Sequence, residues 1–144
     1  MFKHILVPTD GTEASERAAR SAISFAGETG ARVTFYRSIG PGAKGVYGEG
    51  YRFPPARNGE GRMRAANAEL EPMAKCARDA GVAFQTVIGR SAAPHEGILK
   101  AADRRKCDAI FMASHGRHGL ARLASGSVVS KVIAGASVPV VVYH

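Results

Sequence analysis

Short apolar runs rich in β-branched residues alternate along this chain with stretches of helical periodicity, and this alternation most constrains the fold. Strands that alternate with helices form mostly parallel sheets covered by helices on both faces. The buried strands of such sheets are apolar throughout, as ILVP, AIFM and PVVV are. The sequence therefore predicts an α/β fold with a five-stranded, parallel, doubly wound sheet in one domain of residues 1–144. The predicted strands are residues 2–8, 32–38, 82–89, 108–113 and 138–143.

Residues that begin and end helices separate these strands. Thr12 or Ser15 is suited to cap the first helix, and Gly30 lies where a glycine would end it. A second helix is predicted from Met63 to Gly81, with Pro72 expected to kink or split it. The last two helices are predicted to open at residues 91–94 and to span residues 127–134.

The segment of residues 39–62 contains seven glycines and three prolines. Glycine raises the entropy cost of ordering the backbone, and proline removes a hydrogen-bond donor. No helix or strand is expected there. Loops of this length are usually functional or disordered.

The charge balance is basic, with 20 Lys and Arg against 12 Asp and Glu, a formal net charge of +8 and a pI near 10.0. Such a balance permits anion binding. The longest basic cluster is residues 104–106, and the interleaving of aromatic and basic residues typical of RNA-binding proteins is lacking, so nucleic acid is not the expected partner. Two cysteines, Cys76 and Cys107, are too few for a disulfide framework. No signal peptide or membrane-length apolar run is seen, and a cytoplasmic location without membrane contact is expected.

Two loops at predicted strand ends carry residues suited to bind a ligand. Open α/β sheets bind ligands beyond the carboxyl ends of the strands, where the strand order reverses. Asp10, after the first strand, can accept hydrogen bonds from ribose hydroxyls or an adenine amino group. After the fourth strand, Gly116 allows close backbone approach, Arg117 adds charge, and residues 126–127 open a helix whose first amides face an anion. If the two strands are neighbours, these parts form one nucleotide site, although each alone also suits a turn or a helix cap.

Other chemistry has less support in the sequence. His115 and His118 lack the nearby ligands that would complete a metal site. Asp10 or His115 as a base and Ser127 as a nucleophile are not oriented by any recognised catalytic motif. An enzyme is therefore not expected, and any ATP hydrolysis should be slow.

The whole chain, from ILVPTDGTEAS to PVVVYH, resembles a universal stress protein domain. The nucleotide signature of that family, G-x2-G-x9-G-[ST], matches the chain at Gly116, Gly126 and Ser127, with Ala113 in place of the first glycine. The resemblance implies an adenine-nucleotide alpha hydrolase-like, Rossmann-like three-layer sandwich. It also implies ATP, or AMP or ADP, bound together with Mg or Mn. The residues assigned to this site are Pro8, Thr9, Asp10, Ser38, Met112, Ala113, Gly116, Arg117, Gly126, Ser127 and Val128.

The final strand is apolar up to the chain end and would leave unpaired amides at a sheet edge. Pairing of Val138–Tyr143 with a second copy would cover that edge, and the resemblance also implies a homodimer. The first hypothesis is thus a homodimeric, ATP-binding regulatory protein of the stress response. The alternative is a nucleotide-free interaction module, in which Ala113 marks a lost site.

Overall fold

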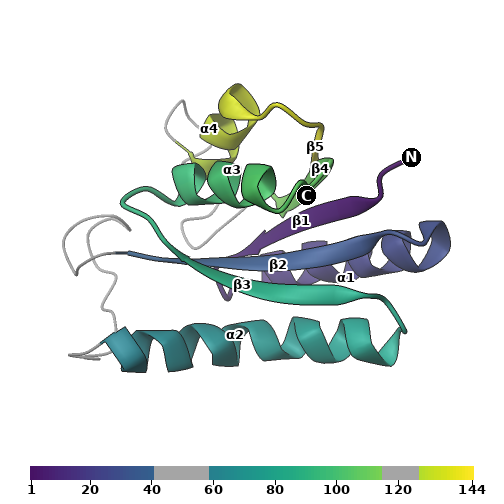
Figure 1. The fold of residues 1–144 in the computed structure, drawn as a ribbon, viewed down its shortest axis with the longest axis horizontal. Helices are drawn as coiled ribbons and strands as arrows, with labels where there is room; N and C mark the ends of the chain where they lie inside the picture. The colour runs from purple at the N-terminus through teal and green to yellow at the C-terminus, as the bar shows by residue number, and fades with distance from the viewer. Residues whose placement is uncertain (41–58, 115–126) are drawn as a thin grey trace.

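One parallel sheet with the strand order β3-β2-β1-β4-β5 organises the chain (Figure 1). The computed structural model describes residues 1–40, 59–114 and 127–144. The strands are β1 (His4–Thr9), β2 (Arg32–Ile39), β3 (Phe84–Arg90), β4 (Ala109–Ala113) and β5 (Val140–Tyr143). The helices are α1 (Glu13–Thr29), α2 (Gly59–Asp79), α3 (Pro94–Arg104) and α4 (Val128–Gly135). All four strand pairings are parallel, which confirms the predicted doubly wound α/β fold.

The two faces of the sheet bury different side chains because successive residues of a strand point to opposite sides. Ile5 and Val7 of β1 pack in one apolar cluster with residues of α1 and α2. Leu6 packs in the other, with Ile98 of α3 and Val132 of α4. Helices α1 and α2 therefore cover one face, and α3 and α4 cover the other (Figure 1).

The largest difference from the predicted elements lies around the Gly- and Pro-rich segment. Ile39 belongs to β2, and α2 begins at Gly59, four positions before the predicted start at Met63. The glycines at positions 59 and 61 therefore lie in the first turn of α2. The first amides of a helix are not part of its internal hydrogen-bond ladder, so glycine disturbs the helix less there than in its interior. Residues 41–58 lie outside the described part of the chain.

Pro72 does not split α2, which is one helix from Gly59 to Asp79. Proline frees the carbonyl four residues earlier, here that of Ala68. Ala68 and Pro72 are both exposed, whereas Leu70 and Met73 are buried. Water can satisfy the freed carbonyl on this outer side, so the helix passes the proline while its inner side stays packed.

A buried tyrosine fixes how α3 packs on β2 and β3. Tyr36 is 2% exposed, and its hydroxyl lies between two glycines, Gly89 of β3 and Gly97 of α3. A Cβ atom added at Gly89 would lie 2.5 Å from the Tyr36 hydroxyl oxygen. The phenol therefore occupies the space that side chains at these two positions would need.

We expect Gly97→Ala to destabilise the protein by about 1–3 kcal/mol, because the new methyl group overpacks the site of the Tyr36 hydroxyl. Urea unfolding measures the change. Gly27→Ala in α1 is the matched control, since its new Cβ meets only Val82 Cγ2 at 3.8 Å, and it should stabilise the helix slightly. Adding Tyr36→Phe to Gly97→Ala should recover part of the loss. Equal effects of the two alanine variants would contradict this packing account.

Candidate functional site

Strands β1 and β4 are neighbours at the point where the strand order reverses. Ile5 pairs with Ala109 and Leu6 with Ile110, while β2 pairs on the other side of β1. The adjacency on which the predicted site depends is therefore confirmed. Since β5 runs parallel to β4, α4 must return from the carboxyl edge of the sheet to the amino edge. The β1–α1 turn and the start of α4 thus lie at the same edge.

The β1–α1 turn holds its shape through its own hydroxyl and carboxylate groups. Asp10 Oδ1 accepts a hydrogen bond from the Thr12 amide at 3.0 Å, and Thr9 Oγ1 accepts one from the Gly11 amide at 3.2 Å. Thr9 Oγ1 also lies 2.9 Å from Ser15 Oγ, and this contact is buried. Gly11 has a φ of +79°, a conformation that glycine adopts without strain. The turn therefore presents Asp10 from a preorganised backbone.

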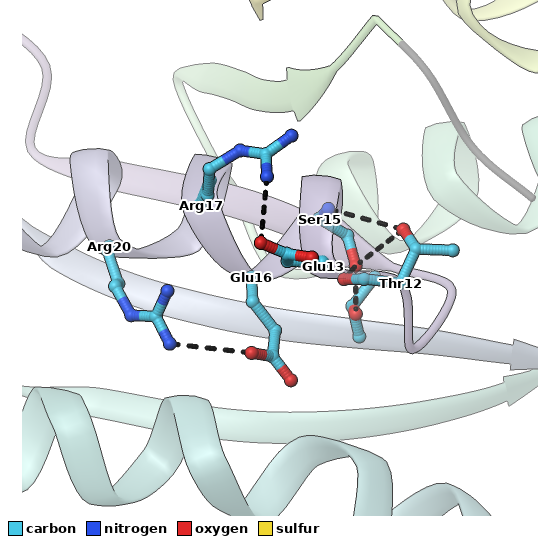
Figure 2. Close-up of polar contacts among 7 residues, drawn as sticks. Thr12, Glu13, Ser15, Glu16, Arg17 and Arg20 are labelled. Atoms are coloured by element: carbon cyan, nitrogen blue, oxygen red, sulfur yellow. Dashed lines mark hydrogen bonds and ion pairs between the residues drawn. The ribbon is translucent and has the colours of Figure 1, made fainter. Parts of the chain in front are cut away.

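Figure 2 shows how α1 starts immediately after this turn. Thr12 is the N-cap, and its side chain accepts from the Ser15 amide at 3.3 Å. Thr12 is thus the capping residue of the two that the sequence left open. The exposed pairs Glu13–Arg17 and Glu16–Arg20 follow along the helix at i,i+4 spacing (Figure 2). Glu13 and Glu16 also suit the positive end of the helix dipole.

A partly buried ion pair supports the turn from the α2 side. Arg37 of β2 lies opposite Thr9, and its Nε is 2.6 Å from Glu69 Oε2 of α2. The Arg37 side chain is 8% exposed. A Cβ atom at Gly11 would lie 2.9 Å from Glu69 Cδ, so the carboxyl group of Glu69 packs directly against the turn. Sequence reasoning missed this pair, because only the pairing of β2 with β1 and the packing of α2 bring these residues together.

Ser127 caps the start of α4, one of the roles that the sequence left open for residues 126–127, and the helix itself begins at Val128. Ser127 Oγ accepts from the Ser130 amide at 3.1 Å and donates to Ser130 Oγ at 2.9 Å. The Lys131 amide donates to the Ser127 carbonyl at 3.1 Å. A ligand at Ser127 would therefore compete with Ser130, and the amides of Val128 and Val129 are the ones that the cap leaves for an anion.

Two buried serines lie at this edge of the sheet. Ser38 ends β2 and is 7% exposed, and Ser114 follows β4 and is 5% exposed. Alternation assigns both to the face covered by α3 and α4, because Tyr36 and Met112, two positions earlier, pack in that cluster. Sequence reasoning named Ser38 but not Ser114. The two-residue period from Ile110 through Met112 was the signal that points to Ser114.

The remaining predicted site residues divide into described and undescribed ones. Pro8 is buried in β1, Met112 is buried in β4, Ala113 is half-buried at the end of β4, and Val128 is 37% exposed. Gly116, Arg117 and Gly126 lie outside the described residues, as do His115 and His118. Within the described ranges, no cluster of three or more His, Cys, Asp or Glu side chains could hold a metal ion.

The buried groups whose pKa is shifted lie mostly at the amino edge of the sheet, opposite the edge that holds the Asp10 turn. Burial and the nearby Arg32 charge lower the pKa of His4. Burial raises the pKa of Cys107 to about 11, which keeps this thiol protonated and unreactive at neutral pH. Burial also raises the pKa of Tyr143 in β5. These shifts reflect packing and give no sign of a reactive centre at the amino edge.

The protein is thus a doubly wound α/β domain with polar residues at the point where the strand order reverses. Comparison with known sequences identifies its family. The profile of the Universal stress protein family matches residues 1–144. Universal stress protein MJ0531 of Methanocaldococcus jannaschii is 32% identical over 144 residues, which cover 99% of this chain and 82% of the relative. A universal stress protein of Thermus aquaticus is 32% identical over 140 residues, 97% of each chain. The chain belongs to the universal stress protein family.

Solved structures share the fold. The structure of MJ0577, from Methanocaldococcus jannaschii, has a TM-score of 0.80 at 29% identity and covers 99% of this chain and 95% of its own. A universal stress protein in complex with cAMP has a TM-score of 0.72 at 22% identity, covering 99% of this chain and 97% of that one. An Archaeoglobus fulgidus universal stress protein in complex with dAMP has a TM-score of 0.71 at 22% identity, covering 97% and 96%.

We expect Glu69→Gln to cost about 1–3 kcal/mol of stability, because it leaves the buried Arg37 guanidinium without its counter-charge. Urea unfolding measures the loss. Asp79→Asn, which breaks the exposed Lys75–Asp79 pair, is the matched control and should leave stability unchanged. If both amide variants unfold at the same urea concentration as the unsubstituted protein, the Arg37–Glu69 ion pair does not stabilise the fold.

Proposed function

We propose that this protein is a binding module that holds an adenine nucleotide, with ATP as the first candidate and AMP or ADP as the others, as a regulatory ligand in a stress response. The observation that carries the proposal is the pairing of β1 with β4, which brings the Asp10 turn and the start of α4 to one edge. Asp10 would accept hydrogen bonds from the base or the sugar. The first amides of α4 would face the phosphates.

The solved relatives support the class of ligand. The structures of two proteins with this fold were solved in complex with cAMP and with dAMP, both of which carry adenine, a sugar and one phosphate group. Both are under 25% identical to this chain, so they speak for the fold and not for individual contacts. The choice of ATP rests on the signature residues at Gly116, Gly126 and Ser127.

A divalent ion, Mg or Mn, would enter with the phosphates of the nucleotide. The described residues offer no cluster of carboxylates for it, so phosphate oxygens and water would supply most of its ligands. Two described carboxylates, Asp10 and Glu69, lie at this edge and are engaged: Asp10 accepts from the Thr12 amide, and Glu69 pairs with Arg37. No recognised catalytic motif orients Asp10 or Ser127 for hydrolysis, which favours binding over catalysis. We propose a regulatory binding protein and not an enzyme, and we place it in the cytoplasm as a separate part of the proposal.

A second candidate function, a nucleotide-free interaction module, has two observations in its favour. Ala113 stands where the family signature has glycine, and Ser127 already satisfies its hydroxyl within α4 through Ser130. Both features reduce what the site offers to a ligand. The titration below decides between the two candidates.

No helix among the described residues is long and apolar enough to cross a bilayer.

Isothermal titration with ATP and Mg²⁺ should show saturable binding. Asp10→Asn, which keeps an oxygen for Thr12 but removes the charge, should weaken binding by about tenfold or more. Ala113→Gly should strengthen binding, because it removes the methyl group beside the nucleotide. Asp103→Asn, an exposed residue of α3, is the control and should leave the affinity unchanged. Absence of saturable binding at millimolar ATP would reject the nucleotide proposal in favour of the interaction module.

The proposed homodimer forms through β5, which is one edge of the sheet. All four β5 residues are only half-buried in the single chain, and pairing with a second copy would cover them. Sedimentation equilibrium should therefore give a dimer. Val142→Lys should shift it towards the monomer, since Val142 belongs to neither apolar cluster and its loss leaves the core intact. Thr86→Lys on the opposite edge strand, β3, should remain dimeric. A wild-type monomer at tens of micromolar protein would overturn this part of the proposal.

A further inference from the structure

His4 is a buried titratable residue at the amino edge of the sheet, away from the proposed binding site. It begins β1, is 4% exposed, and shares its face of the sheet with Leu6. Its amide donates to Asp108 Oδ1 at 3.0 Å, and its carbonyl accepts from the Asp108 amide at 2.9 Å. His4 therefore joins the start of β1 to residues 105–108, the α3–β4 connection, which leads into β4.

Polar side chains of β2 and β3 surround one side of the His4 ring. Its Nε2 lies 2.6 Å from Thr34 Oγ1, and Gln85 Nε2 donates to the same oxygen at 2.9 Å. Gln85 Oε1 in turn accepts from Arg105 Nη1 at 3.4 Å. His4 Nδ1 is buried and has no hydrogen-bond partner among the described residues. A neutral ring with its proton on Nε2 fits best, because it donates to Thr34 and leaves only an acceptor unpaired.

The surroundings of the ring disfavour a positive charge on it. A second proton would make Nδ1 a buried donor without a partner, which is costly. The charged groups that face the ring are Arg32 from β2, and Arg105 and Asp108 from the α3–β4 connection. Cys107 of the same connection adds no charge, since burial raises the pKa of its thiol to about 11. Burial and Arg32 lower the pKa of His4, and they outweigh the Asp108 carboxylate and the Arg105 backbone, which favour the charged ring.

We propose that His4 is a proton-sensitive switch: acidification charges its ring, and the charged ring is accommodated when the α3–β4 connection separates from the start of β1 and admits water. The closed state keeps the ring neutral, and in the open state the ring takes up a proton as an exposed histidine does. Because the two states differ in proton affinity, pH selects between them. This switch lies at the edge opposite the Asp10 turn and does not depend on the proposed function.

The direction of the pH dependence follows from proton linkage. The closed state binds fewer protons than the open or unfolded state, because the pKa of His4 is lowered from 6.5. The stability of the closed state is therefore complete above about pH 6.5 and decreases as the pH falls below that value. Asp108 stays ionised through this range, since its own pKa is held below the usual value.

Urea unfolding between pH 7.5 and 5.0 tests the linkage. Relative to His4→Gln, which keeps an amide donor for Thr34 but cannot titrate, the unfolding constant of wild type should rise below about pH 6.5. The rise should reach at most about tenfold per pH unit, the limit for one proton. Arg32→Gln should weaken it, because it removes an exposed cation that opposes protonation. Arg90→Gln, which removes an exposed cation at the far end of β3, is the matched control and should behave as wild type.

Two measurements on wild type need no variant. In an NMR titration, the His4 ring should titrate below 6.5. Hydrogen-exchange protection of the Asp108 amide should fall between pH 7 and 5.5 more than that of the Ser91 amide, which donates to the Ile39 carbonyl at the opposite edge. A His4 midpoint at or above 6.5, or the same pH dependence in wild type and His4→Gln, would overturn the proposal. Equal loss of protection at both amides would also overturn it, because acid would then loosen the whole fold and not this connection.

Discussion

The pairing of β1 with β4 is the contact on which the rest of the structure depends. Asp108, just before β4, fixes it by accepting hydrogen bonds from the Lys3 amide at 2.8 Å and the His4 amide at 3.0 Å. Burial alone would raise the pKa of Asp108, but these amides outweigh burial and hold the pKa below its usual range. The carboxylate thus sets which residue of β4 faces which residue of β1. A different register would shift the carboxyl end of β4 relative to the carboxyl end of β1.

The two faces of the sheet support this edge in different ways. On the face of α1 and α2, the Arg37–Glu69 ion pair packs against Gly11 and leaves the turn little freedom. On the face of α3 and α4, serine hydroxyls follow the buried apolar residues of β2 and β4. One face therefore provides rigidity, and the other provides groups that can exchange hydrogen bonds. A binding site needs both, because a ligand contact gains little from a donor that must first be ordered.

Much of this architecture could be predicted from the sequence. The apolar β-branched runs predicted all five strands, and the doubly wound class favoured the adjacency of β1 and β4. The structure confirms both. The start of α2 could not be predicted, because the glycines at positions 59 and 61 argue against a helix that tertiary packing nevertheless stabilises. The Arg37–Glu69 pair depends on strand register and on packing between distant segments, which no local pattern records.

The distance along the chain between the two halves of the candidate site has a consequence for how the protein is made. His4 and Asp108 are 104 positions apart, so β1 leaves the ribosome long before its β4 partner is synthesised. Until then β1 can pair with β2 alone, and its second edge stays open. Nascent chains that stop before β4 would expose this apolar edge, which makes them targets for chaperones and prone to aggregation.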